Sequence, residues 1–133
     1  MSALASAARI VTALGLLLAS LLAASAYVVR PWAVGGRSME PGLQHGDRVL
    51  VDRWTYRQRP PQVGEVVLVL GPSSRPMVKR AARVEPGSYA VWVLGDNAAA
   101  SNDSRRFGGV PWASVRGRVV FRYWPPSRVG PVR

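Results

Sequence analysis

The chain has 133 residues, with 18 lysines and arginines against 7 acidic residues and a formal net charge of +11. It contains no cysteine, which excludes disulfides, a thiol nucleophile and a cysteine-ligated zinc site. His45 is the only histidine and the acidic residues are dispersed, so we expect no metal and no cofactor. The positive charge would attract anionic partners, but scattered arginines are more typical of a solvated basic surface.

The N-terminal part is typical of a membrane anchor. Residues 10–29 carry no charge and are bounded by Arg9 and Arg30. As a helix this run would span about 30 Å, the thickness of the hydrocarbon core of a bilayer. We therefore expect a short tail over residues 1–9 and a single transmembrane helix over residues 10–30.

Two questions about this anchor stay open at this point. The segment Ala24-Ser25-Ala26 fits a small-x-small cleavage pattern, so a cleaved signal peptide is the alternative, and the protein would then cut itself after Ala26. Four arginines follow the apolar run closely, whereas one precedes it. Taken alone, the positive-inside rule therefore does not support a catalytic domain outside the cell.

The remaining residues predict one all-β domain over residues 31–125. Short β-type runs alternate with turn residues, which favours a mainly antiparallel, strongly bent sheet or a partly open barrel. The expected strands cover residues 48–54, 65–70, 77–84, 89–94 and 115–124. Residues 57–62 and 98–109 are expected to be loops, and the Pro-rich residues 126–133 a frayed tail.

Lys79, the only lysine, is a candidate general base. A serine hydroxyl becomes an effective nucleophile only when a base removes its proton, and a neutral lysine can do this. Lys79 lies in the apolar run Met77-Val78-Lys79, and burial there would disfavour its charged form and lower its pKa. The alternative is an ordinary solvated surface lysine.

Several motifs in order resemble the signal peptidase I family. The sequence GRSMEPGL at residues 36–43, followed by GDRVLV at 46–51, resembles the nucleophile segment of that family. VGEVV at 63–67 resembles its next strand, and VKRA at 78–81 resembles the block that carries the general-base lysine. The sequence GDNAAASNDSR at 95–105 resembles its G-D-N-x-x-x-S-x-D-S-R block. The resemblance covers about residues 34–124.

The resemblance implies a role for each matching residue. Ser38 would attack the scissile carbonyl and its backbone N–H would donate to the oxyanion, while Lys79 would accept the proton and Ser101 would orient the lysine. Asp103 and Arg105 would form a supporting ion pair. The other supporting residues would be Gly36, Met39, Pro41, Asp96 and Asn97.

Two departures from the family pattern concern the oxyanion site and the size of the catalytic domain. Some members supply a second oxyanion donor from a serine two residues before the nucleophile, where this chain has Gly36. Only residues 80–94 separate Lys79 from Gly95, which is too few for the second β-domain of large members. The runs at 91–97 and 118–124 look similar to the short maturation proteases of nickel-type superoxide dismutase.

The expected function is a single-pass serine endopeptidase of the cell membrane, with its catalytic domain outside the cytoplasm. It would use a Ser/Lys dyad to remove leader or signal peptides after small residues. We expect a leader-bearing substrate and membrane lipid as partners, without nucleic acid or an obligate protein partner. The alternatives are a maturation protease for one client such as nickel superoxide dismutase, a self-cleaving repressor-type protease, and a non-enzymatic basic protein that binds lipid or nucleic acid.

Overall fold

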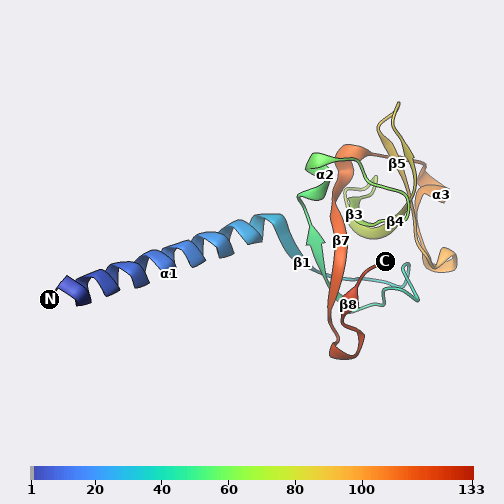
Figure 1. Cartoon of the computed structure of the whole chain (residues 1–133). Helices are drawn as coiled ribbons and strands as arrows, with labels where there is room; N and C mark the ends of the chain where they lie inside the picture. Colours follow the sequence, from blue (N-terminus) through green and yellow to red (C-terminus); the bar gives the residue numbers. More distant parts are fainter. Residues whose placement is uncertain (1) are drawn as a thin grey trace.

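An N-terminal helix projects away from a small β-domain in the computed structural model, which describes residues 2–133 (Figure 1). Helix α1 (Ser2–Val28) has 27 residues. An 18-residue window within Ala3–Val28 has a mean hydropathy of 2.0, and none of that window is buried against the rest of the protein. The helix is therefore long and apolar enough to cross a membrane.

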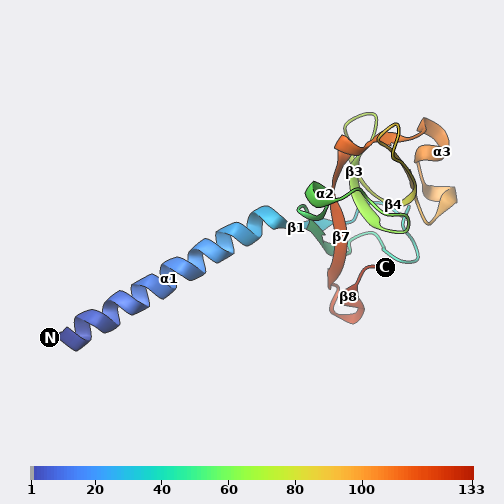
Figure 2. The ribbon, with the colours of Figure 1, turned by 45° about the horizontal axis from the view of Figure 1, so that its top comes forward.

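The domain is built on a single curled sheet in which every strand pairing is antiparallel (Figure 2). The strand order is β1-β2-β7-β3-β4-β5-β6, and β8 pairs with β7. The strands are β1 (Val29–Ala33), β2 (Arg48–Asp52), β3 (Val66–Leu70), β4 (Pro76–Glu85), β5 (Ala90–Leu94), β6 (Val110–Pro111), β7 (Val115–Trp124) and β8 (Gly130–Pro131). The predicted bent antiparallel sheet with one apolar helix is confirmed, and it forms a half-barrel.

Alternation along β3 divides the core between the two faces of the sheet, because successive side chains of a strand point to opposite faces. Val66 and Leu68 belong to one cluster of buried residues, and Val67 and Val69 to the other. The first cluster also contains Met39 and residues of β2, β4 and β7. The segment that follows Ser38 is therefore part of the core.

Short helices lie between the strands. They are α2 (Thr55–Gln58), α3 (Ser104–Phe107) and the 3-10 turns η1 (Ala98–Ala100), η2 (Trp112–Ser114) and η3 (Pro126–Arg128). Of these, α2, η1 and α3 fall in or overlap the expected loops. Strand β1 was not predicted, because its sequence VRPWA contains a proline. A proline lacks the N–H that a central strand needs, but β1 lies at the edge of the sheet, where proline is tolerated.

The C-terminal residues differ from the expected frayed tail. After η3 the chain turns back, and β8 pairs with β7 through Phe121–Pro131 and Arg122–Gly130. The backbone N–H of Val132 donates to the Val120 carbonyl at 3.0 Å, and its side chain packs against the core. These long-range contacts order a segment whose composition alone favoured a tail.

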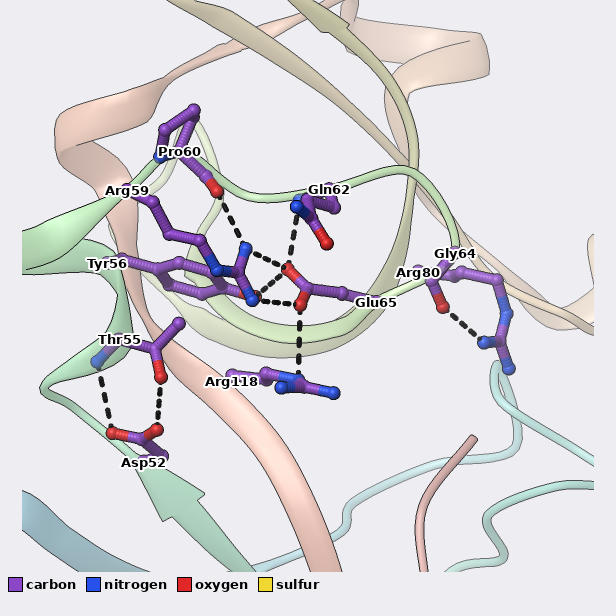
Figure 3. Close-up of polar contacts among 10 residues, drawn as sticks. All are labelled: Asp52, Thr55, Tyr56, Arg59, Pro60, Gln62, Gly64, Glu65, Arg80 and Arg118. Atoms are coloured by element: carbon purple, nitrogen blue, oxygen red, sulfur yellow. Dashed lines mark hydrogen bonds and ion pairs between the residues drawn. The ribbon is translucent and has the colours of Figure 1, made fainter.

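Glu65 fixes the start of β3 through contacts with α2 and β7 (Figure 3). Its carboxylate accepts from the Tyr56 hydroxyl at 3.0 Å and from the Gln62 backbone at 2.9 Å, and it forms ion pairs with Arg59 and Arg118. Burial raises the pKa of Glu65, but the hydrogen bonds outweigh it and the net pKa is lowered. The carboxylate therefore stays charged and ties the loop to the sheet.

We predict that Gly117→Ala lowers the free energy of unfolding by about 1–3 kcal/mol. A β-carbon at Gly117 would lie 2.6 Å from the Asp52 carbonyl oxygen, in a buried part of β7. Gly87→Ala is the matched control, since a β-carbon there meets open space. Urea unfolding of the full chain in detergent measures both, and equal stability of the two variants would contradict the prediction.

Candidate active site

Ser38 lies in a loop that is closed at its base by backbone and side-chain hydrogen bonds. Val34 donates its N–H to the Asp47 carbonyl at 2.8 Å, and the Gly36 N–H donates to Nδ1 of His45 at 3.1 Å. Gly36 has a φ of 78°, a left-handed conformation that favours glycine. The left-handed backbone at position 36 therefore explains why this chain has glycine there and not the serine of some family members. His45 accepts a hydrogen bond within this loop.

Close packing at Gly95 joins this loop to the turn after β5. A β-carbon at Gly95 would lie 2.6 Å from the carbonyl oxygen of Ser38 and would also overlap the Ser101 hydroxyl. The Asn97 backbone N–H donates to the same Ser38 carbonyl at 2.9 Å. Gly95 and Asn97 therefore contact the Ser38 carbonyl, and Ser101 packs against Gly95.

Lys79 is almost fully buried on β4, with 4% of its surface exposed. It pairs with Val67 of β3, and the Arg80–Leu94 pairing continued by one residue brings Lys79 beside Gly95. Within residues 2–133 its amino group has no ion-pair or hydrogen-bond partner. Burial lowers the pKa of Lys79, the charge of Asp103 opposes this shift and that of Arg105 adds to it. Lys79 is thus not the solvated surface lysine of the alternative interpretation.

Asp103 anchors the 95–105 turn and is fully buried. It accepts from the Gly95 N–H at 2.8 Å, from the Ser101 hydroxyl, and from the Arg105 guanidinium at 2.6 Å. Burial opposes its ionisation, but these hydrogen bonds, led by that of Arg105, hold the pKa of Asp103 far below its usual value. The expected Asp103–Arg105 ion pair is present and keeps a negative charge near Lys79.

The Ser101 hydroxyl donates to Asp103, so its proton points away from any base. Its oxygen lone pairs can still accept a hydrogen bond from an amine. Asp96 pairs with Arg80 through two hydrogen bonds of 2.7 and 2.8 Å. Met39 is 2% exposed within the core, and Pro41 is exposed after a cis peptide bond.

A cluster of ion pairs around Asp47, which we name the Asp47 clamp, was not predicted from the sequence. Asp47, 2% exposed, forms ion pairs with Arg122 and Arg128 at 3.4 and 3.0 Å. Both guanidinium groups also donate to the Gly42 carbonyl, at 2.7 and 3.3 Å. Asp47 lies in the GD motif and could have been suspected, but Arg128 belongs to the Pro-rich residues and carried no signal.

Two unpaired strand edges border a cleft next to the end of α1. β1 pairs with β2 alone, and β5 begins to pair with β4 at Arg80, which leaves one side of residues 76–79 without a strand partner among the described residues. Between these edges lies a cavity of about 640 Å³. Its lining residues are Arg30, Pro31, Trp32, Val51, Arg53, Leu68, Leu70, Pro76 and Arg116.

Comparison with known proteins gives consistent results. A family model described as "Signal peptidase, peptidase S26" matches residues 7–88 and 81–124. The mitochondrial ATP-independent inner membrane protease subunit 1a of Arabidopsis thaliana is 32% identical over 130 residues, which cover 80% of this chain and 77% of that protein. The probable signal peptidase I-1 of Synechocystis sp. is 28% identical over 148 residues, covering 78% and 76%.

The thylakoidal processing peptidase 1 of Arabidopsis thaliana is 30% identical over 149 residues, covering 77% of this chain but 44% of that longer protein. Together with the half-barrel, these similarities define a serine-type peptidase. The chain belongs to the signal peptidase family described by that model. Two of these relatives are named for the mitochondrial inner membrane and the thylakoid, and this chain has one apolar helix near its N-terminus.

Lys79→Met is predicted to raise the free energy of unfolding at pH 7 by roughly 0.5–2 kcal/mol, because methionine is apolar and buried at no electrostatic cost. Between the lowered pKa of Lys79 and its ordinary value of 10.5, the unfolded chain binds a proton that the folded chain lacks. The stability of the wild type should therefore rise with pH in that window, and the variant should lose this contribution. Urea unfolding of both proteins from pH 7 to 10 measures it, and an unchanged slope would contradict the prediction.

Asp47→Asn is predicted to lower the free energy of unfolding by about 1.5–3 kcal/mol, because it weakens hydrogen bonds to two charged groups at a buried position. Glu85→Gln is the matched control, since Glu85 is 39% exposed in its pair with Arg83 and should change stability by less than about 1 kcal/mol. Thermal unfolding of the full chain compares them. A smaller effect at Asp47 than at Glu85 would argue against the clamp.

Proposed function

We propose that the protein is a membrane-anchored endopeptidase that removes N-terminal leader peptides after small residues, with a Ser38/Lys79 dyad. The observation that carries this proposal is the burial of an unpartnered Lys79 beside Gly95, which packs against Ser38. A lysine with a lowered pKa can be neutral near physiological pH and can act as a base.

In the first step the Ser38 Oγ attacks the scissile carbonyl carbon and its proton passes to Nζ of Lys79. The tetrahedral intermediate then breaks at the C–N bond, and Lys79 returns the proton to the departing amine. The leader remains attached to Ser38 as an ester. In the second step Lys79 takes a proton from water, and the resulting attack releases the leader with a free carboxylate and restores the serine.

The surroundings of the dyad support this cycle. The backbone N–H of Ser38 is free to donate to the oxyanion, because it takes part in no backbone hydrogen bond within residues 2–133. Gly36 contributes no side-chain donor there, so the backbone carries more of this stabilisation. Ser101, whose proton is engaged by Asp103, is available to accept from Lys79 and to orient it.

An extended leader fits between the free edges of β1 and residues 76–79, where it would add a strand to the sheet. Val34, Met39, Leu43 and Val78 belong to one buried apolar cluster, and Met39 directly follows Ser38; side chains of this cluster would border the subsite for the small residue before the cut. The cavity of about 640 Å³ lies between the same two edges, with Trp32, Leu68 and Leu70 on its walls. The apolar part of a leader would lie along it.

We further propose that α1 is retained as a single-pass anchor in the cell membrane, with the domain outside the cytoplasm. Its length and hydropathy and the membrane names of the relatives support this. The specialised alternative, maturation of one client such as nickel superoxide dismutase, is favoured by the direct β4–β5 hairpin, which has no inserted domain. Neither role requires a metal or an obligate protein partner.

The test is cleavage of a synthetic leader with a small-x-small site by the full chain in detergent micelles. We expect Ser38→Ala and Lys79→Ala each to lower kcat/KM by at least about 10³-fold, as removal of a nucleophile or base does. Ser73→Ala is the matched control in an exposed turn and should keep full activity. Cleavage by either dyad variant at the wild-type rate would refute the assignment.

A further inference from the structure

Four arginines surround the junction between α1 and the domain and take no part in the proposed proton transfers or bond breaking. They are Arg30, Arg53, Arg57 and Arg116, which we name the arginine collar. All four are exposed. Within residues 2–133 none of them forms an ion pair with a carboxylate, whereas eight other arginines do. Four of the arginines that lack a carboxylate partner among the described residues therefore lie together at this junction.

Backbone contacts hold the collar at the end of the helix. The Arg53 N–H donates to the carbonyl of Val28, the last residue of α1, at 2.7 Å. Arg30 follows that residue by two positions. Gly117 packs against the Asp52 backbone, which brings Arg116 beside Arg53. Figures 1 and 2 both show α2, which carries Arg57, next to this junction.

The same arginines line adjoining hollows of the surface. A hollow of about 400 Å³ is bordered by Arg30 and Arg53 together with Ala23, Ala26 and Tyr27 of the helix. Another, of about 160 Å³, is bordered by Arg53, Arg57 and Arg116 together with Tyr56 and Val115. Arg53 belongs to both, so the hollows form one basic surface that is continuous with the apolar side of α1.

Aromatic side chains occur at the same level. Tyr27 is 79% exposed and Trp54 is 49% exposed, and the Arg57 guanidinium lies 5.6 Å from the centre of the Trp54 ring. If α1 spans a bilayer, its apolar run ends at Val29, so Arg30 and Arg53 lie at the level of the lipid headgroups. Exposed tyrosine and tryptophan favour that level too.

We propose that the arginine collar is a binding surface for anionic phospholipid headgroups, which holds the domain against the membrane. The guanidinium groups would pair with headgroup phosphates, for which their geometry is well suited. A nucleic acid is disfavoured, because the collar adjoins a helix whose apolar surface requires lipid. The proposal rests on the proposed membrane anchoring and is independent of the Ser38/Lys79 dyad.

The collar also has a consequence for substrate entry. Arg30, Arg53 and Arg116 also line the 640 Å³ cavity. Lipid headgroups bound there would bring the mouth of the cleft to the membrane surface. A leader emerging from the bilayer would then reach the cleft without crossing open solvent.

The experiment uses the full chain with Ser38→Ala, so that self-cleavage cannot remove the anchor. Native mass spectrometry of the protein in detergent micelles counts bound lipid during titration with phosphatidylglycerol or phosphatidylcholine. The collar variant is Arg53→Gln/Arg57→Gln/Arg116→Gln. The charge-matched control is Arg48→Gln/Arg106→Gln/Arg133→Gln, in which all three arginines are exposed and lack a carboxylate partner among the described residues.

We expect the apparent affinity for phosphatidylglycerol to fall roughly 100-fold in the collar variant, about fivefold for each arginine. The control should retain that affinity, and phosphatidylcholine binding should be similar in all three proteins. Equal binding of both lipids by the parent protein, or an equal loss in the control, would overturn the proposal. So would collar-dependent binding of an oligonucleotide without phosphatidylglycerol binding. Because this readout involves no cleavage, its failure leaves the dyad to be judged by the activity of the Ser38 and Lys79 variants.

Discussion

The close approach at Gly95 is the constraint on which the rest of the site depends. The Ser38 carbonyl, the Ser101 hydroxyl and the strand that carries Lys79 all converge on a position where a β-carbon has no room. A side chain there would separate the Ser38 loop from the β4–β5 hairpin. Since the loop comes from the N-terminal half and the hairpin from the middle of the chain, this contact turns two distant segments into one candidate site.

Electrostatics around that contact favour a neutral amine. Lys79 is buried without a direct partner, while Asp103, the carboxylate whose charge acts on it, is already engaged by Arg105, Ser101 and the Gly95 backbone. Because Asp103 is satisfied, it opposes the loss of the lysine proton without capturing the lysine in an ion pair. A buried lysine lowers the stability of the fold, and the Asp47 clamp and the Glu65 network add stability elsewhere.

Much of this could be predicted from the sequence. Five of the eight strands followed from β-type runs between turn residues, and the membership of the family followed from motifs in order. β1 and the ordered C-terminal residues did not, because edge position and long-range contacts decide their structure where proline argues against it locally. The Asp47–Arg128 ion pair joins residues 81 positions apart, and no local pattern predicts such a pair. The net charge of +11 indicates no particular binding surface until the fold shows which arginines lack a carboxylate partner.

The central claim is that Ser38 forms an ester with the leader during cleavage. Its most direct test is to mix the full chain with a leader peptide, quench with acid within one turnover and digest with trypsin. Trypsin should release residues 38–48, in which Ser38 is the only hydroxyl-bearing residue. We predict that this peptide gains the mass of the leader fragment minus one water. An adduct on another peptide, or none under conditions where cleavage proceeds, would contradict the account.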